Sequence, residues 1–241
     1  MPTHIKPPRS LLSVTGRAIG DFDMIRAGDR ILLGLSGGKD SLSLLHILLD
    51  LQQRAPIKFS LAVCTVDPQS PDYDPSPLVP YLAELGVTYH LERQPIVESA
   101  KTQLRGDSFC AYCSRMRRGI LYRVARQHDY NVLALAQHLD DLAETLLMSV
   151  FFGGKLRTMK AHYTNDAGDI RIIRPLVYAR ERQMTSFAQL ANLPVIIENC
   201  PACFALPTAR QEMKLLLAGL EKQHPKLFPN VRTAMRGLMT S

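Results

Sequence analysis

The sequence predicts an α/β protein: a parallel sheet with helices on both faces, followed by a short helical extension. Three observations predict this class. Short apolar runs recur along the chain, helical patterns separate them, and the chain becomes mainly helical toward its C-terminal end. Its 241 residues, 46% of them hydrophobic, suffice for one large core.

The first half of the chain alternates between helical and strand patterns. Apolar residues at helical spacing predict a lead-in helix at 11–27, and uninterrupted apolar runs predict buried strands. Four prolines in 68–77 predict a surface loop, whereas 95–109 has no clear pattern. The elements expected after the lead-in helix are strand 29–36, helix 39–53, strand 58–67, helix 78–86 and strand 87–93.

The second half continues the alternation before it becomes helical. The expected elements are helix 113–129, strand 131–137, helix 140–154, a strand or extended segment at 170–178, helix 179–193, an extended segment at 194–199, and helices 207–223 and 225–238. These elements divide the chain into a lead-in helix (1–28), an α/β domain (29–174) and a helical extension (175–241) that carries the second pair of cysteines.

The net charge of +7 is compatible with a nucleic-acid partner, although solubility alone explains such a charge about equally well. Several basic residues gather on the predicted helix 113–129, among them Arg115, Arg117 and Arg118. No apolar run reaches the roughly 18 residues that a membrane span needs, and the N-terminal residues have no apolar signal region. We therefore expect a cytoplasmic protein with no membrane segment.

A loop whose residue types suit phosphate binding lies between the first predicted strand and the following helix, in the stretch "LSGGKDS". A helix start presents free backbone N–H groups and the positive end of the helix dipole. The pattern is not a Walker A loop, which would need glycine at Leu33 and a hydroxyl residue at Asp40. A glycine turn without a ligand is the plain alternative. The residues expected to bind the phosphates are Ser36, Gly37, Gly38, Lys39, Asp40 and Ser41.

A second polar cluster follows the strand at 131–137, in "AQHLDDLAET". His138, Asp140 and Asp141 there can hold magnesium or orient phosphates, with Asp40 as a further magnesium ligand. Acids in a first helical turn also favour the helix dipole, and that capping role accounts for one of the two. Asp67, at the end of the second strand, is expected near the nucleoside, because ligands of such sheets lie at the carboxyl ends of the strands.

The cysteines form two Cys-x-x-Cys pairs, Cys110 with Cys113 and Cys200 with Cys203, while Cys64 lies inside a predicted strand. An odd count without a secretory signal argues against a disulfide framework. Spacing alone leaves four interpretations open: inert buried thiols, structural zinc, a redox dithiol or an iron–sulfur cluster. Cys64 is expected to be a small core residue.

A family resemblance narrows these choices. The loop "SGGKDS" resembles the pyrophosphate (PP) loop of the N-type ATP pyrophosphatases, which bind ATP, adenylate a carbonyl oxygen and release pyrophosphate. Together with "CAYCSRMRRGILYRVA", "HLDDLAETLLMSVFFGGKLRTM", "IRPLVYARE" and "CPACF", it resembles the bacterial tRNA 2-thiocytidine synthetase family over nearly the whole chain, from about residue 13 to 236. The resemblance implies the PP-loop fold, of the adenine nucleotide alpha hydrolase-like type.

The resemblance also implies a reaction and its cofactors. ATP, with Mg2+, would adenylate the C2 carbonyl of a tRNA cytidine, at position 32 in that family, and sulfur transfer would give 2-thiocytidine. A 4Fe-4S cluster would be held by Cys110, Cys113 and Cys203, leaving Cys200 as a spare thiol. The residues implied to be catalytic are Lys39, Asp40 and these three cluster cysteines.

Partners follow from the same resemblance. They are tRNA, a cysteine desulfurase as the ultimate sulfur donor, and a second copy of the chain in a homodimer. Candidate contacts to the tRNA backbone are Arg115, Arg117, Arg118, Lys155, Arg157, Arg171 and Arg174. Three alternatives stay open: a lysidine-type tRNA ligase, a tRNA 2-thiouridine synthetase, and a non-catalytic tRNA-binding module with zinc.

Overall fold

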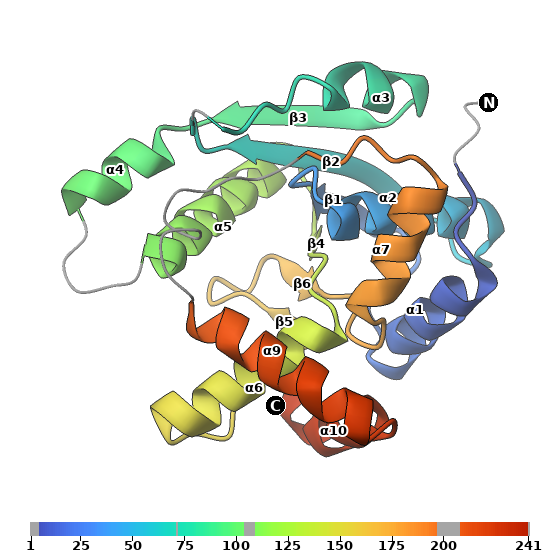
Figure 1. Ribbon diagram of the computed structural model, residues 1–241. Coiled ribbons are helices and arrows are strands. Elements are labelled where there is room, and N and C mark those ends of the chain that lie inside the picture. Colours follow the sequence, from blue (N-terminus) through green and yellow to red (C-terminus); the bar gives the residue numbers. More distant parts are fainter. Residues whose placement is uncertain (1–4, 71, 104–108, 197–207, 241) are drawn as a thin grey trace.

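A six-stranded sheet forms the centre of the molecule in the computed structural model, which describes residues 5–70, 72–103, 109–196 and 208–240 (Figure 1). The strands are β1 Arg30–Gly34, β2 Ser60–Asp67, β3 Thr88–Arg93, β4 Val132–Ala134, β5 His162–Thr164 and β6 Arg171–Ile173. Their order is β3-β2-β1-β4-β6-β5. All neighbours run parallel except β5 and β6, which are antiparallel.

Helices cover both faces of this sheet, as the sequence predicts (Figure 1). Residues of α1, α2 and α7 pack in one hydrophobic cluster, and residues of α4 and α5 pack in the other. The helices are α1 Arg9–Asp21, α2 Lys39–Arg54, α3 Leu78–Glu84, α4 Ile96–Gln103, α5 Phe109–Gln127, α6 Leu139–Gly153, α7 Glu181–Leu190, α9 Ala209–Gln223 and α10 Leu227–Met235, and a 3-10 turn follows at Arg236–Met239.

The central position of β1 explains its sequence. Ile31, Leu32 and Leu33 have no exposed surface, because both faces of this strand are covered by helices and both edges by strands. The α2 helix that follows is buried almost all round over its first half, so its apolar residues do not form a narrow stripe. The loop between β1 and α2 is thereby held between two largely buried elements.

The structure corrects three details of the prediction. The lead-in helix ends at Asp21 rather than at residue 27, because Asp23 adopts a left-handed conformation (φ 46°) that a helix cannot continue. The region 95–109, which has no clear pattern, contains α4 and the start of α5. The short edge strand β5 was not predicted, because its residues, His-Tyr-Thr, form no apolar run.

The C-terminal helices pack on the same core as the sheet. The larger hydrophobic cluster contains Leu11 of α1, Leu33 of β1, Leu217 of α9 and Phe228 of α10. None of the helices that the structure describes is long and apolar enough to cross a membrane.

Candidate active site

Gly37 gives the loop between β1 and α2 its shape. Its φ of 80° lies in the left-handed region, which strains any residue with a side chain. A Cβ atom at this position would also lie 2.5 Å from Cδ1 of Ile196. The Ile196 N–H donates a hydrogen bond to the Gly37 carbonyl over 2.9 Å, so the segment that follows α7 is fixed against the loop. Only glycine satisfies both constraints.

The rest of the loop is held by its own hydroxyl groups. The Gly38 N–H donates to Ser36 Oγ over 3.2 Å, and Ser41 Oγ donates to the Gly38 carbonyl over 3.0 Å. Gly38 is the N-cap of α2 and has no side-chain cap, so the start of this 16-residue helix faces the loop without a carboxylate cap. A bound anion suits such a helix start.

Tyr73 is a contributor that the sequence did not reveal. It belongs to the proline-rich loop 68–77, yet it is buried, and its hydroxyl donates to the Ser36 carbonyl over 3.0 Å. The loop predicted to cross the surface therefore supports the phosphate loop from the side of β2. An isolated tyrosine among prolines carries no periodic signal that could have indicated this contact.

Lys39 and Asp40 begin α2 and form an ion pair at the mouth of the loop. Lys39 Nζ lies 3.1 Å from Asp40 Oδ2 and 3.0 Å from Glu181 Oε1. Burial acts to lower the pKa of Lys39, but the two carboxylates outweigh it and raise that pKa, so the ammonium stays charged. Burial raises the pKa of Asp40, although His138 and Lys39 partly offset the effect.

One carboxylate oxygen of Asp40, Oδ1, has no hydrogen-bond partner among the described residues. This oxygen is buried. A buried carboxylate oxygen without a partner is costly unless a ligand or ion satisfies it. Mg2+ in nucleotide sites is commonly held by one or two carboxylates, substrate phosphates and waters. Asp40 therefore fits a magnesium–nucleotide site, although no set of three His, Cys, Asp or Glu side chains in the described segments is arranged as a complete metal site.

The second polar cluster divides into two parts. His138 caps α6: its Nδ1 accepts from the Asp141 N–H over 3.4 Å, and Asp141 Oδ2 accepts from the His138 N–H over 3.0 Å. His138 Nε2 lies 3.8 Å from Asp40 Oδ2, so His138 and Asp141 face the loop. The carboxylate of Asp140 instead binds α7, accepting from the Glu181 N–H over 2.8 Å and from Arg180 Nε over 3.1 Å.

Asp67 lies where the sequence places it, at the carboxyl end of β2 beside β1. It is nearly buried. Its Oδ1 accepts from the Gln69 N–H over 2.8 Å, and its Oδ2 lies 3.7 Å from Arg93 Nε. The side chain thus shapes the turn after β2 at the edge of the sheet that carries the loop.

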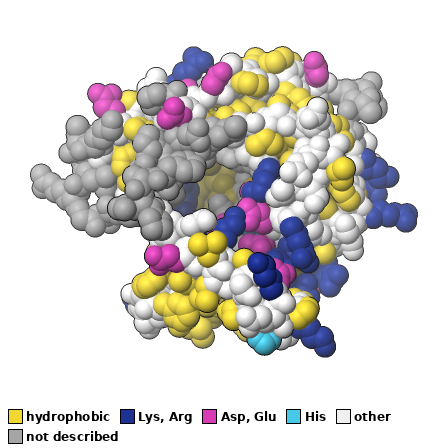
Figure 2. Space-filling view, in the orientation of Figure 1, with side chains coloured by type: hydrophobic (Ala, Val, Ile, Leu, Met, Phe, Trp, Pro, Cys, Tyr) yellow, Lys and Arg dark blue, Asp and Glu magenta, His cyan; other side chains and the backbone are white. Residues whose placement is uncertain are grey.

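Helix α9 adds basic residues that the sequence analysis missed. Arg210 Nη1 lies 3.1 Å from Glu144 and 3.5 Å from Asp141, and Lys214 Nζ lies 2.7 Å from Glu181. Figure 2 shows acidic and basic side chains together where the surface is hollowed. An Arg and a Lys four residues apart on a predicted C-terminal helix indicate a site contribution only if that helix is known to pack beside the phosphate loop.

The first cysteine pair lies on α5. Positions 110 and 113 are one helical turn apart, and the Cys113 side chain is partly exposed. Cys200 and Cys203 lie outside the described residues, so their place relative to this pair stays a prediction. Cys64 is buried within β2, and burial raises the pKa of its thiol to about 12, which confirms the predicted core role.

The candidate tRNA contacts fall into two groups. Arg115 and Arg118 on α5 and Lys155 and Arg157 after α6 are exposed, and Arg117 is half-buried. Arg174 is buried, donating to Gln137 Oε1 and to the Lys160 carbonyl, and Arg171 is paired with Asp29. The prediction of contact with the tRNA backbone is therefore wrong for Arg174. The guanidinium of Arg171 is already paired with Asp29.

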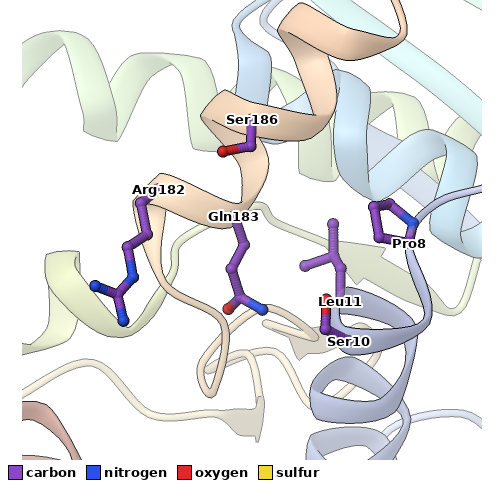
Figure 3. A pocket seen from close by; sticks show the side chains of 6 residues that line it. All are labelled: Pro8, Ser10, Leu11, Arg182, Gln183 and Ser186. Atoms are coloured by element: carbon purple, nitrogen blue, oxygen red, sulfur yellow. The ribbon is translucent and has the colours of Figure 1, made fainter.

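One surface pocket lies away from the loop. It is formed where the start of α1 meets the first turns of α7 (Figure 3), and its lining consists of Pro8, Ser10, Leu11, Arg182, Gln183 and Ser186. None of these residues belongs to the predicted site. The candidate active site is thus defined by the charged groups around the loop rather than by this pocket.

The glycine loop between a buried parallel strand and a helix defines a PP-loop domain, and the family model with that description matches residues 13–200. A tRNA-cytidine(32) 2-sulfurtransferase of Geobacter sulfurreducens is 42% identical over 228 residues, covering 94% of this chain and 89% of the relative. The protein of that name from Syntrophotalea carbinolica is 44% identical over 232 residues, covering 96% and 88%. The chain belongs to this family of tRNA-cytidine(32) 2-sulfurtransferases within the PP-loop proteins.

A solved structure shares the fold. The U34-tRNA thiolase NcsA from Methanococcus maripaludis, determined with its 4Fe-4S cluster, superimposes with a TM-score of 0.75 at 23% identity, covering 94% of this chain and 78% of that one. The likeness supports the arrangement of sheet and helices described above.

Proposed function

We propose that the protein is an ATP-dependent tRNA thiolase that converts a cytidine, at position 32, to 2-thiocytidine. The observation that carries the proposal is the intact loop Ser36–Ser41, opposed by His138 and Asp141, in a chain whose relatives of that name are 40–44% identical over nearly its whole length. An RNA-binding module without catalysis would have no need of this loop.

The loop residues bind the nucleotide in this proposal. The N–H groups at the start of α2 and the Ser36 and Ser41 hydroxyls bind the phosphates that leave as pyrophosphate. Lys39 stabilises the charge that develops as the α-phosphorus is attacked. Asp40 and Asp141 hold Mg2+ against the phosphates, with Asp140 supporting them through α7. Asp67, at the end of β2, lies on the nucleoside side of the loop.

The reaction has two displacements. The C2 carbonyl oxygen of the cytidine attacks the α-phosphorus of ATP, and the bond to the β-phosphate breaks with release of pyrophosphate. Hydrosulfide then attacks C2, and AMP leaves with the former carbonyl oxygen. His138, between Asp40 and Asp141, is placed to orient the triphosphate for the first of these steps. The base must leave the anticodon-loop stack to reach the loop.

The cysteines are the proposed ligands of the group that takes part in sulfur transfer. The one-turn spacing of Cys110 and Cys113 and the softness of thiolate ligands fit an iron–sulfur cluster, with Cys203 as the third ligand. A 4Fe-4S cluster held by three cysteines supplies one iron that can bind inorganic sulfide. A cysteine desulfurase together with a thiol reductant is the proposed source of that sulfide, and the cytoplasm is the proposed compartment.

The exposed basic residues are the proposed tRNA contacts. Arg115, Arg117 and Arg118 lie on the cysteine-bearing helix, and Lys155 and Arg157 follow the end of α6. Phe151 and Phe152, at that same end, are 55% and 62% exposed, and exposed aromatic rings are surfaces on which unstacked bases bind. Their exposure is also consistent with the proposed homodimer, in which a second copy would cover them.

The test is a thiolation assay with defined components. The protein is reconstituted anaerobically with iron and sulfide, then incubated with ATP, Mg2+, sulfide and unmodified tRNA, and the digested nucleosides are identified by mass spectrometry. We expect 2-thiocytidine that requires ATP and disappears in Lys39→Ala and Cys110→Ala. Lys222→Ala, an exposed lysine change on α9, should retain the product.

Each other outcome has a distinct meaning. Thiouridine in place of thiocytidine would keep the chemistry and change the base. Lysidine, formed in a parallel reaction with free lysine in place of sulfide, would indicate the ligase. tRNA binding without any modified nucleoside, in a protein that takes up zinc but not iron, would leave only the binding module.

A further inference from the structure

Glu181 is the first residue of α7, and its backbone is fixed by neighbours. Its N–H donates to Asp140 Oδ2 over 2.8 Å. The preceding Arg180 binds Asp140 and also Glu221 of α9, with its Nη1 2.6 Å from Glu221 Oε1. The side chain of Glu181 therefore starts from a defined position on the rim of the loop.

From that position Glu181 joins two lysines. Its Oε1 lies 3.0 Å from Lys39 Nζ, and its Oε2 lies 2.7 Å from Lys214 Nζ on α9. Glu181 and Lys39 are mostly buried, with 22% and 29% of their side chains exposed. A lysine has a long flexible stem and binds phosphate as a point charge, so an anchored carboxylate can decide where that charge lies.

The charges of this group balance only when Lys214 is present. Lys39 and Lys214 are the two basic groups here, and Asp40 and Glu181 are the two carboxyl groups paired with them, through contacts of 2.7 to 3.1 Å. Without Lys214 an excess negative charge would face the incoming triphosphate. With it, Glu181 can hold Lys39 without repelling the nucleotide.

We propose that Glu181 is a positioning residue that holds the Lys39 ammonium at the phosphate loop, and that Lys214 of α9 is the counter-charge that makes this compatible with ATP binding. The proposal rests on the proposed function in that the loop binds ATP and releases pyrophosphate when a tRNA acceptor is present. It does not depend on which base is modified or on the cluster.

The test is a double-mutant cycle on nucleotide affinity in the full chain. Calorimetry measures binding of the magnesium complex of α,β-methylene-ATP, which cannot release pyrophosphate. We expect Lys214→Met to weaken binding about fivefold, because Glu181 is left uncompensated near the phosphates. Glu181→Gln in the same chain should restore the affinity to within about twofold of wild type, because the four groups are neutral again. Lys222→Met removes the same charge from the same helix near its far end, and should change affinity less than twofold.

A second readout separates positioning from charge. Glu181→Gln alone should bind the analogue at least as well as wild type, yet with unmodified tRNA present as the acceptor it should release pyrophosphate from ATP about tenfold more slowly at saturation, because Lys39 loses its anchor. The melting temperatures of all variants are measured, so that a purely structural bridge between α7 and α9 would appear as lowered stability with unchanged affinity.

Three results would overturn the proposal. They are wild-type affinity in Lys214→Met, weakened binding that Glu181→Gln does not rescue, and an unchanged turnover in Glu181→Gln. If wild type itself fails to bind the analogue, the proposed function falls together with this inference, whereas binding by wild type with indifferent variants removes the inference alone.

Discussion

Gly37 is constrained twice, by its own backbone and by the side chain of Ile196. The left-handed φ and the 2.5 Å approach to Ile196 Cδ1 act at the same atom, the Cβ that glycine lacks. We expect Gly37→Ala to abolish measurable binding of α,β-methylene-ATP and to lower the free energy of unfolding by about 1–3 kcal/mol. Calorimetry and chemical denaturation measure the two effects.

Gly16 is the matched control for this change. It lies inside α1, and a Cβ added there would have no neighbour within 4 Å, so Gly16→Ala should leave affinity unchanged and stabilise the protein by up to about 1 kcal/mol. Normal nucleotide affinity in Gly37→Ala would contradict the assignment of the loop.

The two acids at the start of α6 and α2 have different surroundings, and their variants should separate accordingly. Asp140→Asn weakens the contacts to Arg180 and the Glu181 N–H, so we expect a melting temperature several degrees lower with unchanged Mg2+ dependence of analogue binding. Asp40→Asn should weaken the Mg2+ dependence of analogue binding and change the melting temperature little, because Asp40 Oδ1 has no described partner and Lys39, the partner of Oδ2, keeps its ion pair with Glu181. Magnesium titrations and thermal melts of both variants check this, and identical behaviour of the two would argue against the division.

At the scale of elements, α9 is held on α6 through an ion pair. Glu144 is buried, and burial together with Asp141 raises its pKa, while Arg210 partly offsets this. A carboxyl whose folded-state pKa is raised favours folding below its unfolded pKa and loses that contribution as the pH rises through the folded value. Removal of Arg210 raises the pKa of Glu144 in the folded state further. The loss of folding stability caused by this removal therefore grows with pH.

We therefore expect Arg210→Ala to destabilise the protein by about 1–2 kcal/mol at pH 8 and by clearly less at pH 5. The exposed half of Arg210 limits the size of the effect. Urea unfolding at the two pH values measures it. Arg210→Ala combined with Glu144→Gln should lose the pH dependence, and a loss that is equal at both pH values in the single variant would contradict this account.

The elements that could be predicted from the sequence are those whose apolar pattern extends over several residues. The five parallel strands and the helices between them follow from apolar runs and helical spacing, because their burial leaves a pattern. β5 and α4 could not be found. β5 contains no apolar run, unlike the equally short β4 and β6, and α4 lies in a stretch of mixed character. The loop Ser36–Ser41 was predictable because its chemistry is contiguous in the chain.

The parts of the site that escaped prediction come from distant elements. Glu181, Lys214 and Tyr73 reach the loop only through the packing of α7, α9 and the proline-rich loop. Arg174 shows the converse error: an arginine after a strand was taken for a surface group, yet the carboxyl edge of β6 is covered there. A single sequence gives the residues but not which segments meet.

At the scale of the molecule, the exposed basic residues after α6 should determine how tRNA binding depends on salt. From 145 to 164 the chain has no acidic residue, and Lys155, Arg157 and Lys160 are exposed. We expect Lys155→Ala and Arg157→Ala each to weaken tRNA binding and to reduce the slope of log affinity against log salt by about one. Fluorescence anisotropy with labelled tRNA measures both.

Lys58 is the control, because it lies at the amino ends of the strands. It is exposed just before β2, away from the carboxyl ends of the strands, so Lys58→Ala should leave the slope unchanged. If Lys155→Ala and Lys58→Ala have equal effects, charge in general rather than this surface governs binding.

The hydrogen bond between Gly37 and Ile196 has a consequence for biosynthesis. The two residues meet only when all six strands of the sheet have been made, because Ile196 follows β6. Glu181, the partner of Lys39, precedes Ile196 in the chain, whereas Lys214, the partner of Glu181, follows it. Helix α2 can form early on the ribosome, but the nucleotide loop at its start cannot be completed until these residues have emerged. We therefore expect a nascent chain to bind no ATP at the loop before Glu181, Ile196 and Lys214 have emerged.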